Sequence, residues 1–253
     1  MIILCVIFIL GITEYKNLNN TYYENLDENF TNALNFYETE YSHEQLIALL
    51  QNGNIPQKQI AALKLDKIES NNDAQILLSN LTGQDGKIRE AVSLRIAEFM
   101  KNKNYIKYFA PSENTQIFLD AVIDINGNIC RNVISAISNL INDNKFCEIF
   151  CKKLTELTFS LLDIVEKFDF QDGKYKVNKE AFKLYWCLET IYVFWDKLNF
   201  DDLKNIISRA SEIGEYTIRE KAAKILTHDF DDKDLIVVKN KLKNDSNYYV
   251  RRF

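Results

Sequence analysis

Side chains that could act as general bases are scarce in this chain. Of its 253 residues only two are histidines, His43 and His228, and they stand far apart in the sequence. Asp201–Asp202 and Asp231–Asp232 are carboxylate pairs of the kind that can share acid/base work. Both pairs stand where a helix is expected to begin, and an acidic side chain there offsets the helix dipole. We therefore interpret them as helix caps and predict no catalytic residue.

Cysteine spacing offers one candidate metal site. Cys147 and Cys151 are four residues apart, so a helix would place both thiols on one face. Zinc needs about two more ligands, and neither histidine is near in sequence. We predict core cysteines in a reducing compartment and no metal site. The chain also has no glycine-rich phosphate-binding or dinucleotide-binding motif, so we predict no cofactor.

One segment is rich in aromatic residues and is the candidate partner-binding site. Helical spacing spreads its rings over more than one face, so some of them are expected to be exposed, and exposed tryptophan and tyrosine mark binding hot spots. The alternative is that a longer helix needs larger side chains to fill the core. The candidate residues are Tyr185, Trp186, Tyr192, Trp195 and Asp196.

The composition favours a soluble, all-α fold. Hydrophobic residues make up 47% and charged residues 26% of the chain, which argues against global disorder. Only 7 glycines and 2 prolines are present, too few for a turn-rich β-sandwich. The net charge of −5 makes nucleic acid an unexpected partner.

Ten apolar residues in a row open the chain, within a segment at 1–12 that we separate from the rest. The run is too short to span a bilayer as a helix. It could be an export signal, an anchor, a start-site artefact or a strip buried against the first helices. A membrane contact is expected only if residues 1–12 are an anchor, and otherwise a cytoplasmic location is expected. Residues 13–253 are predicted to form one domain.

Apolar residues at helical spacing arrive in pairs of segments, separated by short loops of Asn, Asp, Gly and Ser. A helical hairpin cannot bury both of its faces alone, so it needs a neighbour on each side. The expected pairs are 73–82 with 87–101, 112–124 with 129–142, 145–168 with 178–198, and 201–212 with 217–228, with further pairs before 73 and after 231.

Each second helix opens with a similar phrase, a polar turn followed by Ile or Val, Arg and then Ala. The arginines of this phrase are Arg89, Arg131, Arg219 and Arg251, and acidic turn residues precede two of them at Asp85 and Asp245.

This pattern resembles the HEAT repeat over about residues 42–253. The resemblance implies a right-handed α–α superhelix of about five to six helical hairpins. It also implies a ladder in which a turn aspartate and a second-helix arginine join neighbouring repeats. The arginines match the family, whereas Asn126 and Glu215 replace the turn aspartate, which puts the ladder geometry in doubt at those two turns.

The resemblance implies a scaffold or adaptor that binds a protein along its concave surface without catalysis. One alternative is an acidic, immunity-type inhibitor of a basic toxin, which the net negative charge would favour. Another is a HEAT-like DNA alkylation-repair glycosylase, because that family uses Trp and Asp on its concave face and Trp195–Asp196 is similar. Mixed charge on the second helices would support the scaffold, a continuous acidic strip the inhibitor, and a basic groove around Trp195 and Asp196 the glycosylase.

Overall fold

A computed structural model describes residues 31, 34–170 and 178–253. The chain divides into two compact units, Met1–Ser42 and His43–Phe253. In the first unit the described part includes a helical stretch at 34–38. The apolar segment 1–12 lies outside the described residues, and so does most of the stretch 13–42 in which the repeat domain was expected to begin.

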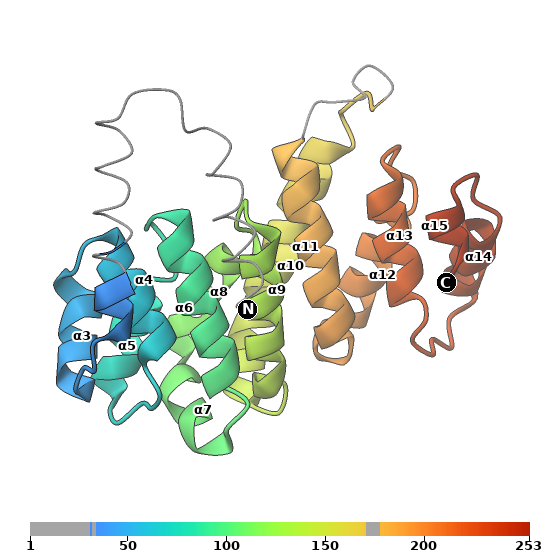
Figure 1. The fold of residues 1–253 in the computed structure, drawn as a ribbon. Helices are drawn as coiled ribbons and strands as arrows, with labels where there is room; N and C mark the ends of the chain where they lie inside the picture. The colour runs from blue at the N-terminus through green and yellow to red at the C-terminus, as the bar shows by residue number, and fades with distance from the viewer. Residues whose placement is uncertain (1–30, 32–33, 171–177) are drawn as a thin grey trace, which may run out of the picture. The chain divides into compact units, whose positions relative to one another are not determined.

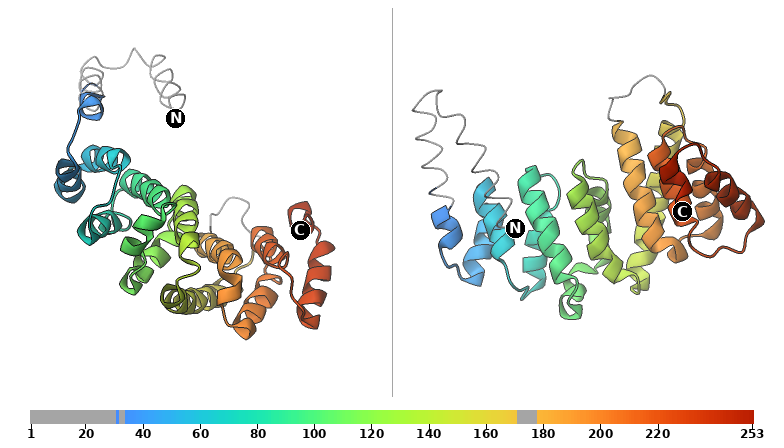
Figure 2. Two further views of the ribbon diagram at one scale, coloured as in Figure 1. Left: turned by 90° about the horizontal axis from the view of Figure 1, so that it is seen from below. Right: turned by 45° about the vertical axis from the view of Figure 1, so that its right-hand side comes forward.

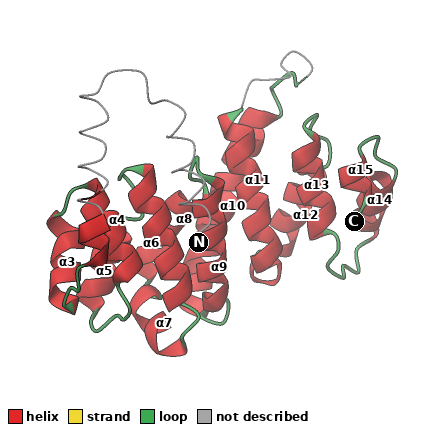
Figure 3. Ribbon diagram, viewed as in Figure 1, coloured by secondary structure: helices red, strands yellow, loops and turns green. Residues whose placement is uncertain are grey.

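The second unit is built from helices, and Figure 3 shows no strand among the described residues. The first helices of the hairpins are α3 (His43–Asn52), α5 (Asn71–Ser79), α8 (Thr115–Val122), α10 (Asn144–Val165), α12 (Phe200–Ala210) and α14 (Lys233–Lys243). The second helices are α4 (Ile55–Lys64), α6 (Gly86–Phe99), α9 (Gly127–Ile137), α11 (Lys179–Phe194), α13 (Tyr216–Ile225) and α15 (Tyr248–Arg251). These bounds confirm the expected pairs and the all-α solenoid.

One helix was not expected from the sequence. It is α7 (Lys103–Phe109), which lies between the second and third hairpins and packs against α5. Its side-chain cap is Asn102, which accepts a hydrogen bond from the backbone N–H of Asn104. Short 3-10 turns also extend three of the helices, at Ser112–Asn114, Ser138–Leu140 and Trp195–Lys197.

The hairpins stack in two layers within His43–Phe253 (Figures 1 and 2). Consecutive second helices pack closely from α4 to α6 to α9, and again from α11 to α13 to α15. Contact between α9 and α11 is much sparser. There the long helix α10 packs against α8, α11 and α12 and so connects the two halves of the stack.

Local sequence explains where the helices begin. Asn54 and Gln57 form a reciprocal capping box at the start of α4, and Pro56 occupies the first turn, where its missing N–H costs nothing. Asp232 caps α14 through the backbone amides of Asp234 and Leu235. At α12 the cap is Asn199, and the carboxylates of Asp201–Asp202 lie in the first turn. Both acidic pairs thus lie at the positive ends of helix dipoles.

The core between the layers is aromatic at its centre. Phe118, Phe146, Phe150 and Phe194 are fully buried, and their rings lie 5.3–6.1 Å apart in sequence order from α8 through α10 to α11. Among the described helices, none combines the length and apolarity that crossing a bilayer requires.

The cysteines of this unit are buried as small apolar side chains and are unbridged: Cys130, Cys147, Cys151 and Cys187. Burial raises the pKa of Cys130, Cys151 and Cys187 to about 12, so these thiols stay protonated near neutral pH. The described residues hold no cluster of His, Cys, Asp and Glu with the arrangement of a metal site.

Candidate functional site

Two arginine–aspartate pairs join neighbouring hairpins. The guanidinium of Arg89 binds both carboxylate oxygens of Asp124, at 2.6 and 3.0 Å. Arg219 binds Asp245 in the same way, at 2.7 and 3.2 Å. In each case the arginine belongs to one second helix, and the aspartate to the turn before the next one. Both pairs are largely shielded from water, and the two-pronged geometry gives directional hydrogen bonds.

Each of these arginines also binds the turn that precedes its own helix. Arg89 donates to the carbonyl of Gln84, and Arg219 donates to the carbonyls of Ile213 and Gly214, both at 2.8 Å. One side chain therefore ties together two successive turns.

The acidic partner of Arg89 is Asp124, which the sequence analysis did not single out. Asp85 instead caps its own helix, because its side chain accepts the backbone N–H of Lys87 at 2.8 Å. Asp124 stands two residues before the cap Asn126, as Asp245 stands two residues before the cap Asn247. The recurring Asp-x-Asn phrase was the signal for this pairing in the sequence.

Arg131 is not part of a comparable pair. Among the described residues its side chain makes a single hydrogen bond, to the side chain of Asn128 at 3.3 Å, and it is exposed. Arg89 stands four residues after its helix cap, whereas Arg131 stands five residues after Asn126. The equivalent position in α9 is Cys130, whose thiol donates to the carbonyl of Asp124 at 3.1 Å.

The last arginine of the phrase, Arg251, has the expected register at four residues after Asn247. It donates to the carbonyls of Asp245 and Ser246, at 2.6 and 2.8 Å. It therefore binds its own turn as Arg219 does, while the pair with Asp245 is made by Arg219.

On the solvent-facing side of the second helices α11, α13 and α15, called the outward face below, charges of both signs are paired with one another. Glu189 of α11 bridges Lys221 and Lys224 of α13, at 2.9 and 2.5 Å. Glu220 of α13 pairs with Arg252, which follows α15. Over these described helices the charge is therefore mixed rather than of one sign.

The aromatic residues predicted on α11 are divided between this face and the interior. Tyr185 and Tyr192 lie on the outward face, where Lys221 and Lys224 stand 4.3 Å from their ring centroids. Such cation–π contacts hold the two helices together. Trp186 is 7% exposed, and its ring packs against the first residue of α9, Gly127. It therefore has almost no surface to offer a partner.

Trp195 and Asp196 follow α11 and do not converge. The indole of Trp195 stacks on the ring of His228 at a centroid separation of 4.6 Å, and Phe230 covers it edge-on at 5.3 Å. Asp196 is exposed and pairs with the adjacent Lys197 at 3.3 Å. The ring of Trp195 is thus packed against its neighbours, while the carboxylate of Asp196 is paired with a lysine at the surface.

Two further tyrosines extend the aromatic face beyond α11. Tyr216 at the start of α13 is 38% exposed, and Tyr249 of α15 is 51% exposed. Their ring centroids lie 6.2 Å apart, and Arg252 stands 5.5 Å from the ring of Tyr249. The surface formed by Tyr185, Tyr192, Tyr216 and Tyr249 is called the tyrosine face below. Sequence reasoning missed its second half, because those two residues are far apart in the chain and lie outside the dense aromatic segment.

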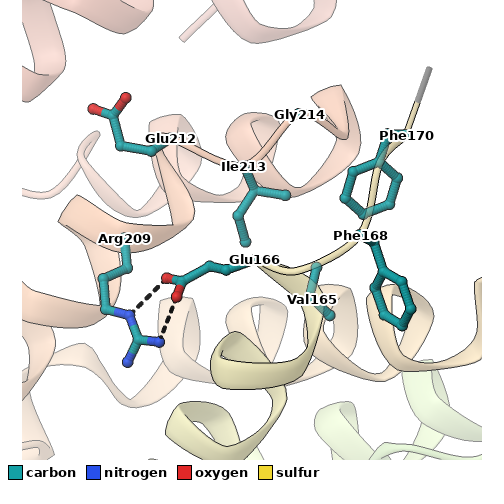
Figure 4. Close-up of a pocket in the computed structure, with 8 residues that line it drawn as sticks. All are labelled: Val165, Glu166, Phe168, Phe170, Arg209, Glu212, Ile213 and Gly214. Atoms are coloured by element: carbon teal, nitrogen blue, oxygen red, sulfur yellow. Dashed lines mark hydrogen bonds and ion pairs between the residues drawn. The ribbon is translucent and has the colours of Figure 1, made fainter.

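A separate pocket lies at the end of α10 and beside the turn between α12 and α13 (Figure 4). Its volume is about 320 Å³. The lining residues are Val165, Glu166, Phe168, Phe170, Arg209, Glu212, Ile213 and Gly214. None of them was a candidate in the sequence analysis.

No family model and no curated protein matches the chain. Two solved structures are similar in arrangement. A designed armadillo repeat protein is 14% identical, with 83% of this chain and 96% of that chain covered and a TM-score of 0.46. An engineered protein from the Northeast Structural Genomics Consortium is also 14% identical, with 84% and 93% covered and a TM-score of 0.45. By its own helix arrangement the chain is an armadillo/HEAT-like helical-repeat solenoid, and these likenesses concern the fold alone.

Proposed function

We propose that this protein is a non-catalytic scaffold that binds another protein through the solvent-facing side of its second helices. This is the side that the sequence analysis expected to be concave and to bind the partner. The observation that carries the proposal is the tyrosine face, which runs from α11 across α13 to α15. Tyrosine is enriched at the centres of protein interfaces, because its ring offers a large contact area and a polar end with few rotatable bonds. Arginine is also enriched there, because its planar guanidinium donates several hydrogen bonds.

The electrostatics of the face favour a scaffold over the acidic inhibitor. Glu189 and Glu220 are already paired with cations, so little excess negative charge is left there to attract a basic toxin. Pairs that exist before binding also reduce the cost of covering these charges, since no isolated charge has to lose its water.

Replacing Tyr216 and Tyr249 together by alanine is expected to reduce partner capture about tenfold or more, since each hot-spot ring is worth more than about 1 kcal/mol. The measurement is affinity capture from a lysate of the native cell, with wild-type and variant eluates compared by quantitative mass spectrometry. Tyr108→Ala is the matched control, because Tyr108 lies on α7, away from the tyrosine face. If the double variant and the control retain the same proteins in the same amounts, the tyrosine face is not the binding surface.

The absence of catalysis is tested separately with methylated DNA. We expect no release of alkylated bases above the rate without protein, because the ring of Trp195 is stacked against His228 and covered by Phe230, so little of it is free to stack on a base. Chromatography of the released bases is the measurement, with a known alkylation-repair glycosylase as the positive control. Release that disappears in Asp196→Asn would establish the enzyme alternative instead.

A further inference from the structure

The hairpin of α14 and α15 is packed on one side only within the described part of the chain. Its two helices contact each other and the preceding helices α12 and α13 (Figure 1). The opposite side of the pair is called the far face below. The internal junctions of the stack show which side chains lie there, because each hairpin repeats the positions of the one before it.

The first helix brings an apolar residue and two cations to the far face. In α12 Lys204 directly follows a buried leucine and reaches the next hairpin, where it binds Asp232 at 2.9 Å. Ile236 has the same place in α14, directly after a buried leucine, and is 46% exposed. Lys239 and Lys243 stand three and seven residues after Ile236, on the same side of the helix. Neither lysine forms an ion pair among the described residues.

The second helix adds an aromatic ring. Tyr216 is the first residue of α13, and its ring packs 6.2 Å from that of Tyr249 in the next second helix. Tyr248 is the first residue of α15 and so has the place of Tyr216. It is 67% exposed. Exposed apolar groups of this size, gathered with Ile236 at one end of the stack, are typical of a docking surface.

The guanidinium of Arg251 is occupied at one edge only. In Arg219 the Nη1 group binds the carbonyls of its own turn, while Nε and Nη2 bind the carboxylate of Asp245 in the next hairpin. Arg89 divides its donors in the same way. In Arg251 the Nη1 group likewise binds its own turn. Its Nε and Nη2 groups have no hydrogen-bond partner in the described part of the chain. The edge that receives an aspartate at two internal junctions is therefore open here.

We propose that the far face docks a helical hairpin of a partner polypeptide, with an aspartate in the turn before its second helix and acidic residues along its first helix. The aspartate would bind the open edge of Arg251 through two parallel hydrogen bonds, as Asp245 binds Arg219. The acidic residues would complement Lys239 and Lys243, which have no opposite charge beside them.

A second copy of this chain fits the far face less well. At the internal junctions the aspartate stands two residues before the cap of a second helix. In the first hairpin that position is Asn52, two residues before the cap Asn54, so the side chain there is neutral. The far face shares no residue with the tyrosine face, and its test does not depend on the function proposed above.

The probe is a synthetic helical hairpin closed by a disulfide, with the turn sequence aspartate–serine–asparagine and glutamates on its first helix. One matched hairpin has asparagine in place of the turn aspartate, and another has lysines in place of the glutamates. Circular dichroism establishes that all three are helical. Each is titrated into the full ¹⁵N-labelled chain, and the amide shifts of Ile236 and Tyr248 are followed by NMR. We expect the first hairpin to bind at least about tenfold more tightly than either of the others, and added salt to weaken it.

Two variants with matched controls locate the interaction. Arg251→Ala is expected to weaken binding about tenfold and to abolish the preference for aspartate over asparagine in the turn. Arg131→Ala, which removes an exposed arginine of the same sequence pattern in α9, should leave both unchanged. Lys243→Ala should weaken binding and reduce its salt dependence, whereas Lys241→Ala, which removes a lysine paired with Glu212, should not. Far-ultraviolet circular dichroism reports whether each variant is folded.

Several outcomes would overturn this assignment. They are equal affinity for either matched hairpin, equal affinity for a short single-stranded DNA, no shift at the amides of the far face, or losses in the controls as large as those in Arg251→Ala and Lys243→Ala. Analytical ultracentrifugation of the chain alone tests the remaining occupant. Dimers that form with rising concentration and disappear in Arg251→Ala would show that a second copy covers the far face instead.

Discussion

Glu189→Ala is expected to lower the free energy of unfolding by about 3–5 kcal/mol, because it removes the partner of a buried cation. Lys221 is 6% exposed and forms its ion pair with Glu189 at 2.9 Å. Without that carboxylate its ammonium group would remain away from water and without an opposite charge. Urea unfolding followed by circular dichroism at pH 7 measures the loss.

The contribution of Glu189 depends on pH in a defined direction. Burial opposes ionisation of this carboxyl, but hydrogen bonds from Lys224 and Lys221 outweigh it and hold its pKa below the ordinary value of 4.5. A group whose folded-state pKa is depressed stabilises the fold fully above its unfolded pKa and loses that contribution as the pH falls through the folded value. The difference between wild type and Glu189→Ala should therefore be complete at pH 7 and shrink as the pH falls below 4.5.

The control for this prediction is Glu212→Ala. Glu212 also binds a lysine, but its side chain is 67% exposed and that of Lys241 is 54% exposed. Water screens such a pair, so its loss should cost no more than about 1 kcal/mol. Equal losses in the two variants would show that Lys221 is not a buried charge that depends on Glu189.

The second large effect concerns the link between hairpins. Arg219→Ala is expected to cost about 2–4 kcal/mol, because it leaves the largely buried carboxylate of Asp245 without its partner. The carbonyls of Ile213 and Gly214 lose a hydrogen-bond donor in the same variant. Arg89→Ala should have a similar effect through Asp124. Urea unfolding measures both losses.

Arg131→Ala is the matched control. This arginine also belongs to the repeated sequence pattern, but it stands one residue later after its helix cap, is exposed, and bonds only to Asn128 among the described residues. Its removal should change stability by no more than about 0.5 kcal/mol. A loss at Arg131 as large as that at Arg219 would mean that the repeated phrase, rather than the observed pairing, sets the stability.

The sequence by itself determined the helical hairpins and the repeat that they form. Periodic apolar residues, polar caps such as Asn54 and Asp232, and the scarcity of glycine and proline act within one or two helical turns. Local signals of this kind can be recognised without knowing what packs where. The short helix α7 was missed because its seven residues are too few to establish a period.

Only the tertiary structure decided which side chains meet. Arg89 reaches Asp124 across 35 residues of sequence, whereas Arg131 bonds within its own turn. A shift of one residue turns a side chain by about 100° around the helix axis, so nearly identical phrases point in different directions. The same reason places Tyr185 on the outward face and its neighbour Trp186 in the core. The pocket, too, exists only because the ends of α10 and α12 come together, and no local pattern encodes the position of one helix end relative to another.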